Sequence, residues 1–116
     1  MTNDDCLFCR FVSGEIAPDI VYQDDDVLAC RDINPQAPTH VLIVPKKHTR
    51  DASSVEPADG GMLVAIMNAA RIIAEAEGIA GGGYRLVANV GPDAGQTVFH
   101  LHVHLLGGRS MTWPPG

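Results

Sequence analysis

Apolar residues recur along this chain with two different periods, and each period predicts a different kind of element. Short β-branched runs, several with apolar and polar positions alternating, predict strands at Ile20–Tyr22, Val27–Arg31, His40–Val44, Tyr84–Val90 and Val98–Leu106. Asp24–Asp26 lie between the first two strands, so these two form a hairpin. Pro45 ends the third strand, whose continuous apolar run indicates burial.

A period of about 3.6 residues replaces the alternation in the middle of the chain. Apolar side chains at positions i, i+3, i+4, i+7 and i+10 form one stripe: Leu63, Ile66, Met67, Ala70 and Ile73. The stripe predicts an amphipathic helix and places Met67 in the core. Ser53 or Ser54 is the expected cap, Pro57 suits the first turn, and Gly78 ends the helix.

The order of these elements predicts the fold class. A short helix near Cys9–Gly14 precedes the hairpin, and GGRSMTWPPG (107–116) is an irregular tail. Hairpin, strand, helix, strand and strand make an α+β fold, with a mainly antiparallel five-stranded sheet, one long helix and a short N-terminal helix. The 116 residues, 46% of them hydrophobic, contain no repeat or linker, so we expect residues 1–116 to form a single domain.

Charge and hydropathy narrow the function classes. The net charge is −6 and Lys46–Lys47 is the only basic doublet, which argues against a nucleic-acid partner. The sequence contains no apolar run of membrane-spanning length, and its acidic N-terminus does not resemble a signal peptide, so we expect a cytoplasmic protein without a membrane partner. The three cysteines are then more plausible as thiols or metal ligands than as disulfide partners.

The segment VFHLHVHLL places His100, His102 and His104 on one face of the last predicted strand. Three interpretations are open: the polar half of a half-buried strand, a metal site, or a site with a nucleophilic imidazole. The other two histidines of the chain, His40 and His48, lie at the two ends of the segment THVLIVPKKH. This concentration favours a functional site.

The motif QTVFHLHVHLL resembles the signature of the histidine triad (HIT) family, in which histidines alternate with apolar residues. The resemblance continues through CLFCRFVSGEIAPDIVYQDDDVLACRDINPQAPTHVLIVPKKH and ANVGPDAGQ, and the ending LGGRSMTWPPG is similar to the Hint branch. It implies a homodimer with a HIT-like fold. It also implies a hydrolase of purine nucleoside phosphoramidates (AMP or GMP conjugates), which works through a nucleotidyl-histidine without a catalytic metal.

The resemblance implies that His102 attacks the α-phosphorus. A neutral imidazole is already a nucleophile at pH 7, provided that its other nitrogen donates its proton to an acceptor. The backbone carbonyl of His100 is the expected acceptor. His104 and His40 match family positions near the phosphate or in a proton relay, and Thr97 is the candidate partner of the leaving amine, although it could also be an ordinary strand residue.

Further residues are expected to bind the substrate. Asp32 matches the ribose-binding aspartate of the family, although it could instead cap the turn before the third strand. Asn89 matches a position near the phosphate or leaving group, and Gly95 and Gln96 can offer backbone N–H groups to developing charge. Trp113 either covers an active site, reaching toward that of the partner, or packs on its own domain. Apolar side chains that a core would also use are expected to line the base slot: Leu7, Phe8, Phe11 and Ile16.

The pair Cys6-x-x-Cys9 is half of a zinc site. The ends of the histidine triad lie about 13 Å apart along an extended strand, so the three histidines cannot share one ion. The resemblance suggests that His48 and His100 complete a structural Cys₂His₂ site. A redox pair and two buried cysteines remain alternatives, and Cys30 is expected to be a small core residue.

Other function classes remain open on the sequence alone. A non-catalytic nucleotide-binding or scaffold protein would keep the same pocket. A metallohydrolase would use His102 and His104 to bind zinc. A dinucleoside polyphosphate hydrolase is the alternative within the family.

Overall fold

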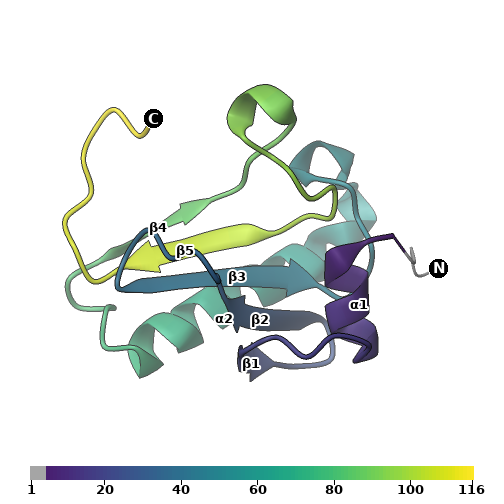
Figure 1. The fold of residues 1–116 in the computed structure, drawn as a ribbon, viewed down its shortest axis with the longest axis horizontal. Helices are drawn as coiled ribbons and strands as arrows, with labels where there is room; N and C mark the ends of the chain where they lie inside the picture. Colours follow the sequence, from purple (N-terminus) through teal and green to yellow (C-terminus); the bar gives the residue numbers. More distant parts are fainter. Residues whose placement is uncertain (1–4) are drawn as a thin grey trace.

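The structure, a computed structural model, describes residues 5–116. Its helices are α1 (Leu7–Ser13) and α2 (Gly60–Ala76), with 3₁₀ turns η1 (Ala52–Ser54), η2 (Pro57–Asp59) and η3 (Pro92–Ala94). Its strands are β1 (Ile20–Gln23), β2 (Val27–Arg31), β3 (Thr39–Pro45), β4 (Tyr84–Val87) and β5 (Val103–Gly107). Every pairing between them is antiparallel, in the order β1-β2-β3-β5-β4 (Figure 1). The predicted α+β class, hairpin and five-stranded sheet are confirmed.

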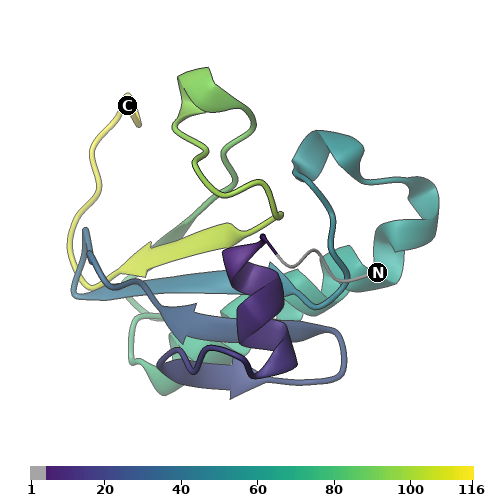
Figure 2. The same ribbon diagram turned by 45° about the vertical axis from the view of Figure 1, so that its right-hand side comes forward.

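The two helices lie on opposite faces of the sheet (Figure 2). On one face, α2 buries Ile66, Ala69, Ala70, Ile73 and Ala74 against the inward side chains of the strands. On the other face, Phe8 and Cys9 of α1 pack against Val44. Because successive side chains of a strand alternate between faces, Ile43 joins the α2 core and Val44 joins the α1 cluster. The α1 face is the one that holds the candidate site.

The predicted stripe of the long helix is rotated in the structure. Met67 was expected in the core but is 49% exposed, and Leu63 is also exposed. The alanines at positions 69, 70 and 74 face the sheet instead, because small side chains let helix and sheet approach closely. The predicted serine caps are wrong as well: Asp51 accepts hydrogen bonds from Ser53 and Ser54 in η1, and α2 begins only at Gly60.

The last strand is shorter than predicted. Its ladder with β3 runs only as far as the Ile43–Val103 pair. Continuing this register would place Leu101 opposite Pro45, which has no N–H to donate. Leu101 donates instead to the carbonyl of Thr49, at 2.6 Å. His100 and His102 therefore precede the ladder, and β4 ends at Val87, not Val90, because its partner strand begins at Val103.

Within residues 5–116, no helix has the length and apolar character needed to cross a membrane.

Candidate active site and metal cluster

His102 is held by a backbone carbonyl. Its Nδ1 lies 2.8 Å from the carbonyl oxygen of His100. A carbonyl can only accept, so Nδ1 carries the proton and Nε2 keeps its lone pair. The edge-on ring of Phe8, with its centroid 5.0 Å from that of His102, packs against the imidazole. This arrangement leaves the half-buried His102 with the free nitrogen that a nucleophile requires.

His40 and His104 form a hydrogen-bonded pair on the neighbouring strands β3 and β5. Nε2 of His40 lies 2.9 Å from Nδ1 of His104 and 3.4 Å from a carboxylate oxygen of Asp32. The backbone N–H of Gln36 donates to Nδ1 of His40 at 3.0 Å, so the proton of His40 sits on Nε2. Sequence analysis missed Gln36, because a backbone donor leaves no signal in residue type.

Both rings of this pair are uncharged at neutral pH. Burial lowers the pKa of His40, and the nearby Asp32 carboxylate opposes this shift only in part. Burial also lowers the pKa of His104 to about 4, and the neighbouring His102 and His40 add to the shift, because a proton on either ring would repel a second positive charge. The N–H of His40 is directed at His104, so the pair offers one N–H donor without positive charge, on Nε2 of His104.

A cavity of about 250 Å³ lies between α1 and the sheet, and two of its wall residues adjoin the histidines: Phe8 packs on His102, and Asp32 lies beside His40. Its walls are mostly apolar and include all four predicted base-slot residues: Leu7, Phe8, Phe11, Ile16, Ala17, Pro18, Asp19, Cys30, Arg31, Asp32, Ile33 and Leu42. One oxygen of Asp32 accepts from Asn34 N–H in the predicted Asx turn, and the residue also lines the cavity; its binding of ribose stays a prediction. Cys30 is buried, as expected, and burial raises its pKa to about 11.

The loop before His100 is fixed from within. The side chain of Gln96, only 4% exposed, accepts from the N–H of Gly91 and donates to the carbonyl of Arg50. The N–H groups of Gly95 and Gln96 donate to the carbonyls of Pro92 and Gly91. We expected these two N–H groups to face the substrate, but the loop already uses them. Gln96 thus holds the loop rather than a ligand in this conformation.

The three remaining predicted residues do not line the cavity between α1 and the sheet. Thr97 is exposed and lines a second cavity of about 260 Å³ together with Leu7, His48 and Phe99. Asn89 is half-buried just beyond the end of β4. Trp113 is 82% exposed, so its side chain does not pack on its own domain. The tail that carries it leaves the sheet at the end opposite α1 (Figure 1).

Four donor groups converge where α1 begins. The ligand atoms of Cys6, Cys9, His48 and His100 all lie within 4.8 Å of one another. Nδ1 of His100 is 3.2 Å from Sγ of Cys6 and 3.1 Å from Nδ1 of His48. Nδ1 of His48 is 3.3 Å from Sγ of Cys9. All four groups predicted for the zinc site therefore meet.

The chemistry of this cluster fits zinc. Zinc bonds of about 2.0 Å to nitrogen and 2.3 Å to sulfur place tetrahedral ligands roughly 3.3–3.8 Å apart, close to the spacing here. Nε2 of His100 donates to the carbonyl of Pro45 at 2.8 Å. Nδ1 is therefore unprotonated, and its lone pair is directed at the cluster. Burial lowers the pKa of His100, so the ring is neutral, as a ligand must be.

Comparison with known proteins agrees with this geometry. The HIT domain family model matches residues 13–111. The crystal structure of a HIT family hydrolase from Legionella pneumophila Philadelphia 1 has a TM-score of 0.94 and 53% identity, covering 97% of this chain and 100% of that one. The 14 kDa zinc-binding protein of Zea mays is 46% identical over 114 residues, which cover 95% of this chain and 87% of that protein. Adenylylsulfatase HINT1 of Arabidopsis thaliana is 45% identical over 114 residues, 95% and 76% of the two chains. This chain therefore belongs to the HIT family, as a hydrolase of its Hint branch.

Proposed function

We propose that this hydrolase cleaves purine nucleoside phosphoramidates, conjugates in which an amine is bound to the phosphorus of AMP or GMP. The observation that carries the proposal is the hydrogen bond from His102 Nδ1 to the carbonyl of His100, which reserves Nε2 for attack. Asp32 on the cavity wall suits the ribose hydroxyls, and the apolar walls suit a heterocyclic base. In this proposal Asn89 contacts the phosphate or the leaving group.

The reaction has two steps. In the first, Nε2 of His102 bonds to the α-phosphorus while the phosphorus–nitrogen bond to the amine breaks. The departing amine takes up a proton that solvent water supplies through the Thr97 hydroxyl, its proposed hydrogen-bonding partner, and the water consumed in the second step returns one proton to solvent. In the second, water breaks the bond between phosphorus and His102, which releases the nucleoside monophosphate and restores the imidazole. His104 supplies a neutral N–H donor that stabilises the negative charge on the phosphate oxygens, and His40 orients it by donating to its Nδ1.

Adenylyl sulfate is the second candidate substrate, because the name of one relative points to it. The Arabidopsis relative is named as an adenylylsulfatase, an activity on an AMP conjugate whose leaving group is sulfate. The same attack by His102 applies to either conjugate, because only the leaving group differs. An anion requires no proton to leave, so exchanging Thr97 for valine should slow an amine conjugate more than adenylyl sulfate.

The proposal includes a structural zinc ion held by Cys6, Cys9, His48 and His100. The geometry of the cluster supports it, as does the name of the maize relative. When bound, the ion ties the start of α1 to the segment that carries His102. No step of the reaction passes through it.

We also propose a cytoplasmic homodimer. Three exposed apolar side chains of α2 support this assembly: Leu63, Val64 and Met67. Among the strands of residues 5–116, β4 lies at an edge of the sheet, and none of them pairs with its outer side. An exposed Trp113 in the tail fits the expectation that the tail reaches toward the partner's site. Sedimentation equilibrium tests the dimer, and Met67→Glu should weaken it.

Steady-state turnover of AMP and GMP phosphoramidates, adenylyl sulfate and a dinucleoside polyphosphate tests the function. The wild-type protein should favour the phosphoramidates, and His102→Ala should lower kcat at least about 10³-fold, because only binding and electrostatic contributions then remain. AMP binding by the same variant, measured by calorimetry, should change little. A wild-type protein that binds AMP and turns over none of these compounds would point to the non-catalytic alternative.

A further inference from the structure

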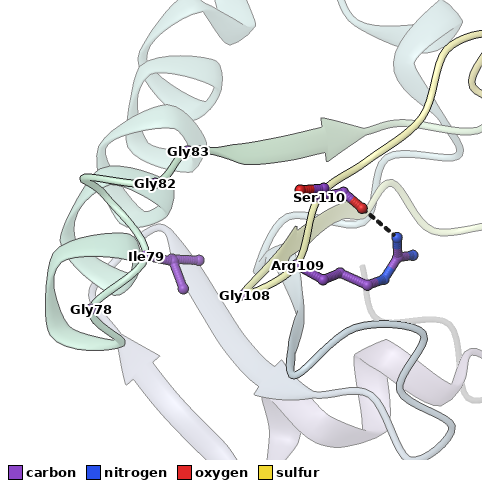
Figure 3. Close-up of a pocket in the computed structure, with 7 residues that line it drawn as sticks. All are labelled: Gly78, Ile79, Gly82, Gly83, Gly108, Arg109 and Ser110. Carbon is purple, nitrogen blue, oxygen red and sulfur yellow. Dashed lines mark hydrogen bonds between the residues drawn. The ribbon is translucent and has the colours of Figure 1, made fainter.

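One arginine of the C-terminal tail binds the loop that precedes β3. Nε and one terminal nitrogen of Arg109 both donate to the carbonyl oxygen of Gln36, at 3.1 and 3.0 Å. The other terminal nitrogen donates to the carbonyl of Ser110 at 3.1 Å (Figure 3). A planar guanidinium that grips one oxygen with two donors fixes the orientation of that peptide group. Gly108 packs against Pro38 beside this contact.

Gln36 is also the residue that determines the tautomer of His40. Its N–H donates to Nδ1 of His40, while Arg109 holds its carbonyl. With a donor facing Nδ1, His40 carries its proton on Nε2, 2.9 Å from Nδ1 of His104. His104 accepts at Nδ1 and therefore carries its own proton on Nε2. A chain of hydrogen bonds thus runs from Arg109 to the active site.

We propose that Arg109 is a positioning residue, which fixes the tautomers of His40 and His104 through the backbone of Gln36. The consequence for catalysis rests on the proposed function. A His104 fixed in this form presents an N–H to the phosphate oxygens, whereas the opposite tautomer would present a lone pair to negative charge. His104 also lies beside the proposed nucleophile, with its ring centroid 5.0 Å from that of His102.

The same hydrogen bond explains why the second cluster of ligand-type groups is not a good metal site. Asp32, His40 and His104 place their ligand atoms within 4.8 Å of one another. A histidine that binds a metal through one nitrogen donates the proton of its other nitrogen to an acceptor. Nδ1 of His40 faces a donor instead, so Nε2 must keep its proton and cannot ligate. This cluster is arranged for hydrogen bonding.

The test compares two tail variants, Arg109→Met and Arg85→Met. Arg85 donates to the carbonyl of Thr112 at 2.9 Å, so it anchors the same tail without touching the loop at Gln36. In ¹⁵N-labelled protein, the ring nitrogens of each histidine report its tautomer by NMR. Wild type and Arg85→Met should show only the Nε2–H form of His40 and His104, and Arg109→Met should show a mixture.

Kinetics with an AMP phosphoramidate add a second readout. Arg109→Met should lower kcat by about tenfold and leave KM nearly unchanged, a smaller loss than the roughly 10²-fold that a 1 Å misplacement of a reacting group costs. The kcat of Arg109→Lys should lie between those of wild type and Arg109→Met, since an ammonium cannot reproduce the two hydrogen bonds of a planar guanidinium to one oxygen. Arg109→Lys also serves as the test variant if Arg109→Met does not fold.

Wild-type tautomers in a folded Arg109 variant would overturn the inference. So would equal losses in Arg109→Met and Arg85→Met, because these would indicate only that the tail must be docked. If wild-type protein cleaves no phosphoramidate, the proposed function fails, yet the NMR comparison still decides whether Arg109 sets the two tautomers.

Discussion

Replacing Gly108 with alanine tests how the tail is held against the loop before β3. Gly108 has φ = +91°, and an added Cβ would lie 2.9 Å from Cβ and 3.2 Å from Cγ of Pro38. An L-residue in this backbone region costs about 1–2 kcal/mol, and forcing a methyl group into filled space costs about 1–3 kcal/mol more. We therefore expect Gly108→Ala to lower the free energy of unfolding by about 2–5 kcal/mol.

Gly14→Ala is the matched control. Gly14 has φ = +83° but nothing within 4 Å of an added Cβ, so this variant should lose only the backbone part, about 1–2 kcal/mol. Urea unfolding followed by circular dichroism measures both losses, and an unchanged m-value shows that the two-state comparison holds. Equal losses in the two variants would refute the reasoning, because the tail would then be free to move away from Pro38 at no cost.

Two further predictions concern the histidines and the metal. The folded pKa of His104 should be near 4, against about 6.5 in the unfolded chain. Between these pH values the unfolded state binds more protons, so the free energy of unfolding should fall as pH drops from about 6.5 toward 4. An NMR titration of folded His104 with a midpoint near 6.5 would contradict this prediction. Exhaustive chelation should lower the Tm of wild-type protein but not that of Cys9→Ala; a wild-type Tm that chelation leaves unchanged counts against structural zinc.

Side-chain patterns allowed much of the fold to be predicted. The continuous apolar run around Val41 and Ile43 and the acidic turn at Asp24–Asp26 predicted strands that the structure shows. Met67 was wrongly placed in the core because an apolar stripe identifies hydrophobic residues but does not determine which face of the helix packs on the sheet. Ala69 and Ala70 permit closer packing, so the face that carries them is buried instead. The start of β5 was misplaced for a different reason, since it depends on the strand it pairs with.

In the candidate site too, side-chain types were easier to predict than backbone contacts. The pair Cys6-x-x-Cys9 indicated half of a zinc site, the resemblance to the HIT family suggested His48 and His100, and the structure brings the four together. One backbone contact, from His102 to the carbonyl of His100, was predicted and is present, but other backbone contacts were not predicted. The N–H groups of Gly95 and Gln96 look available in sequence but are consumed inside their loop, whereas the peptide of Gln36, which looks like any other, holds a buried histidine.

The central claim is that the middle histidine of the triad carries the nucleotide between the two steps. Mass spectrometry of protein quenched in alkali during turnover of an AMP phosphoramidate tests it most directly. We predict one added adenylyl group on the peptide that spans residues 100–104, localised to His102 by fragmentation and missing from His102→Ala. Turnover with no adduct at any quench time, or an adduct that persists in His102→Ala, would contradict the account.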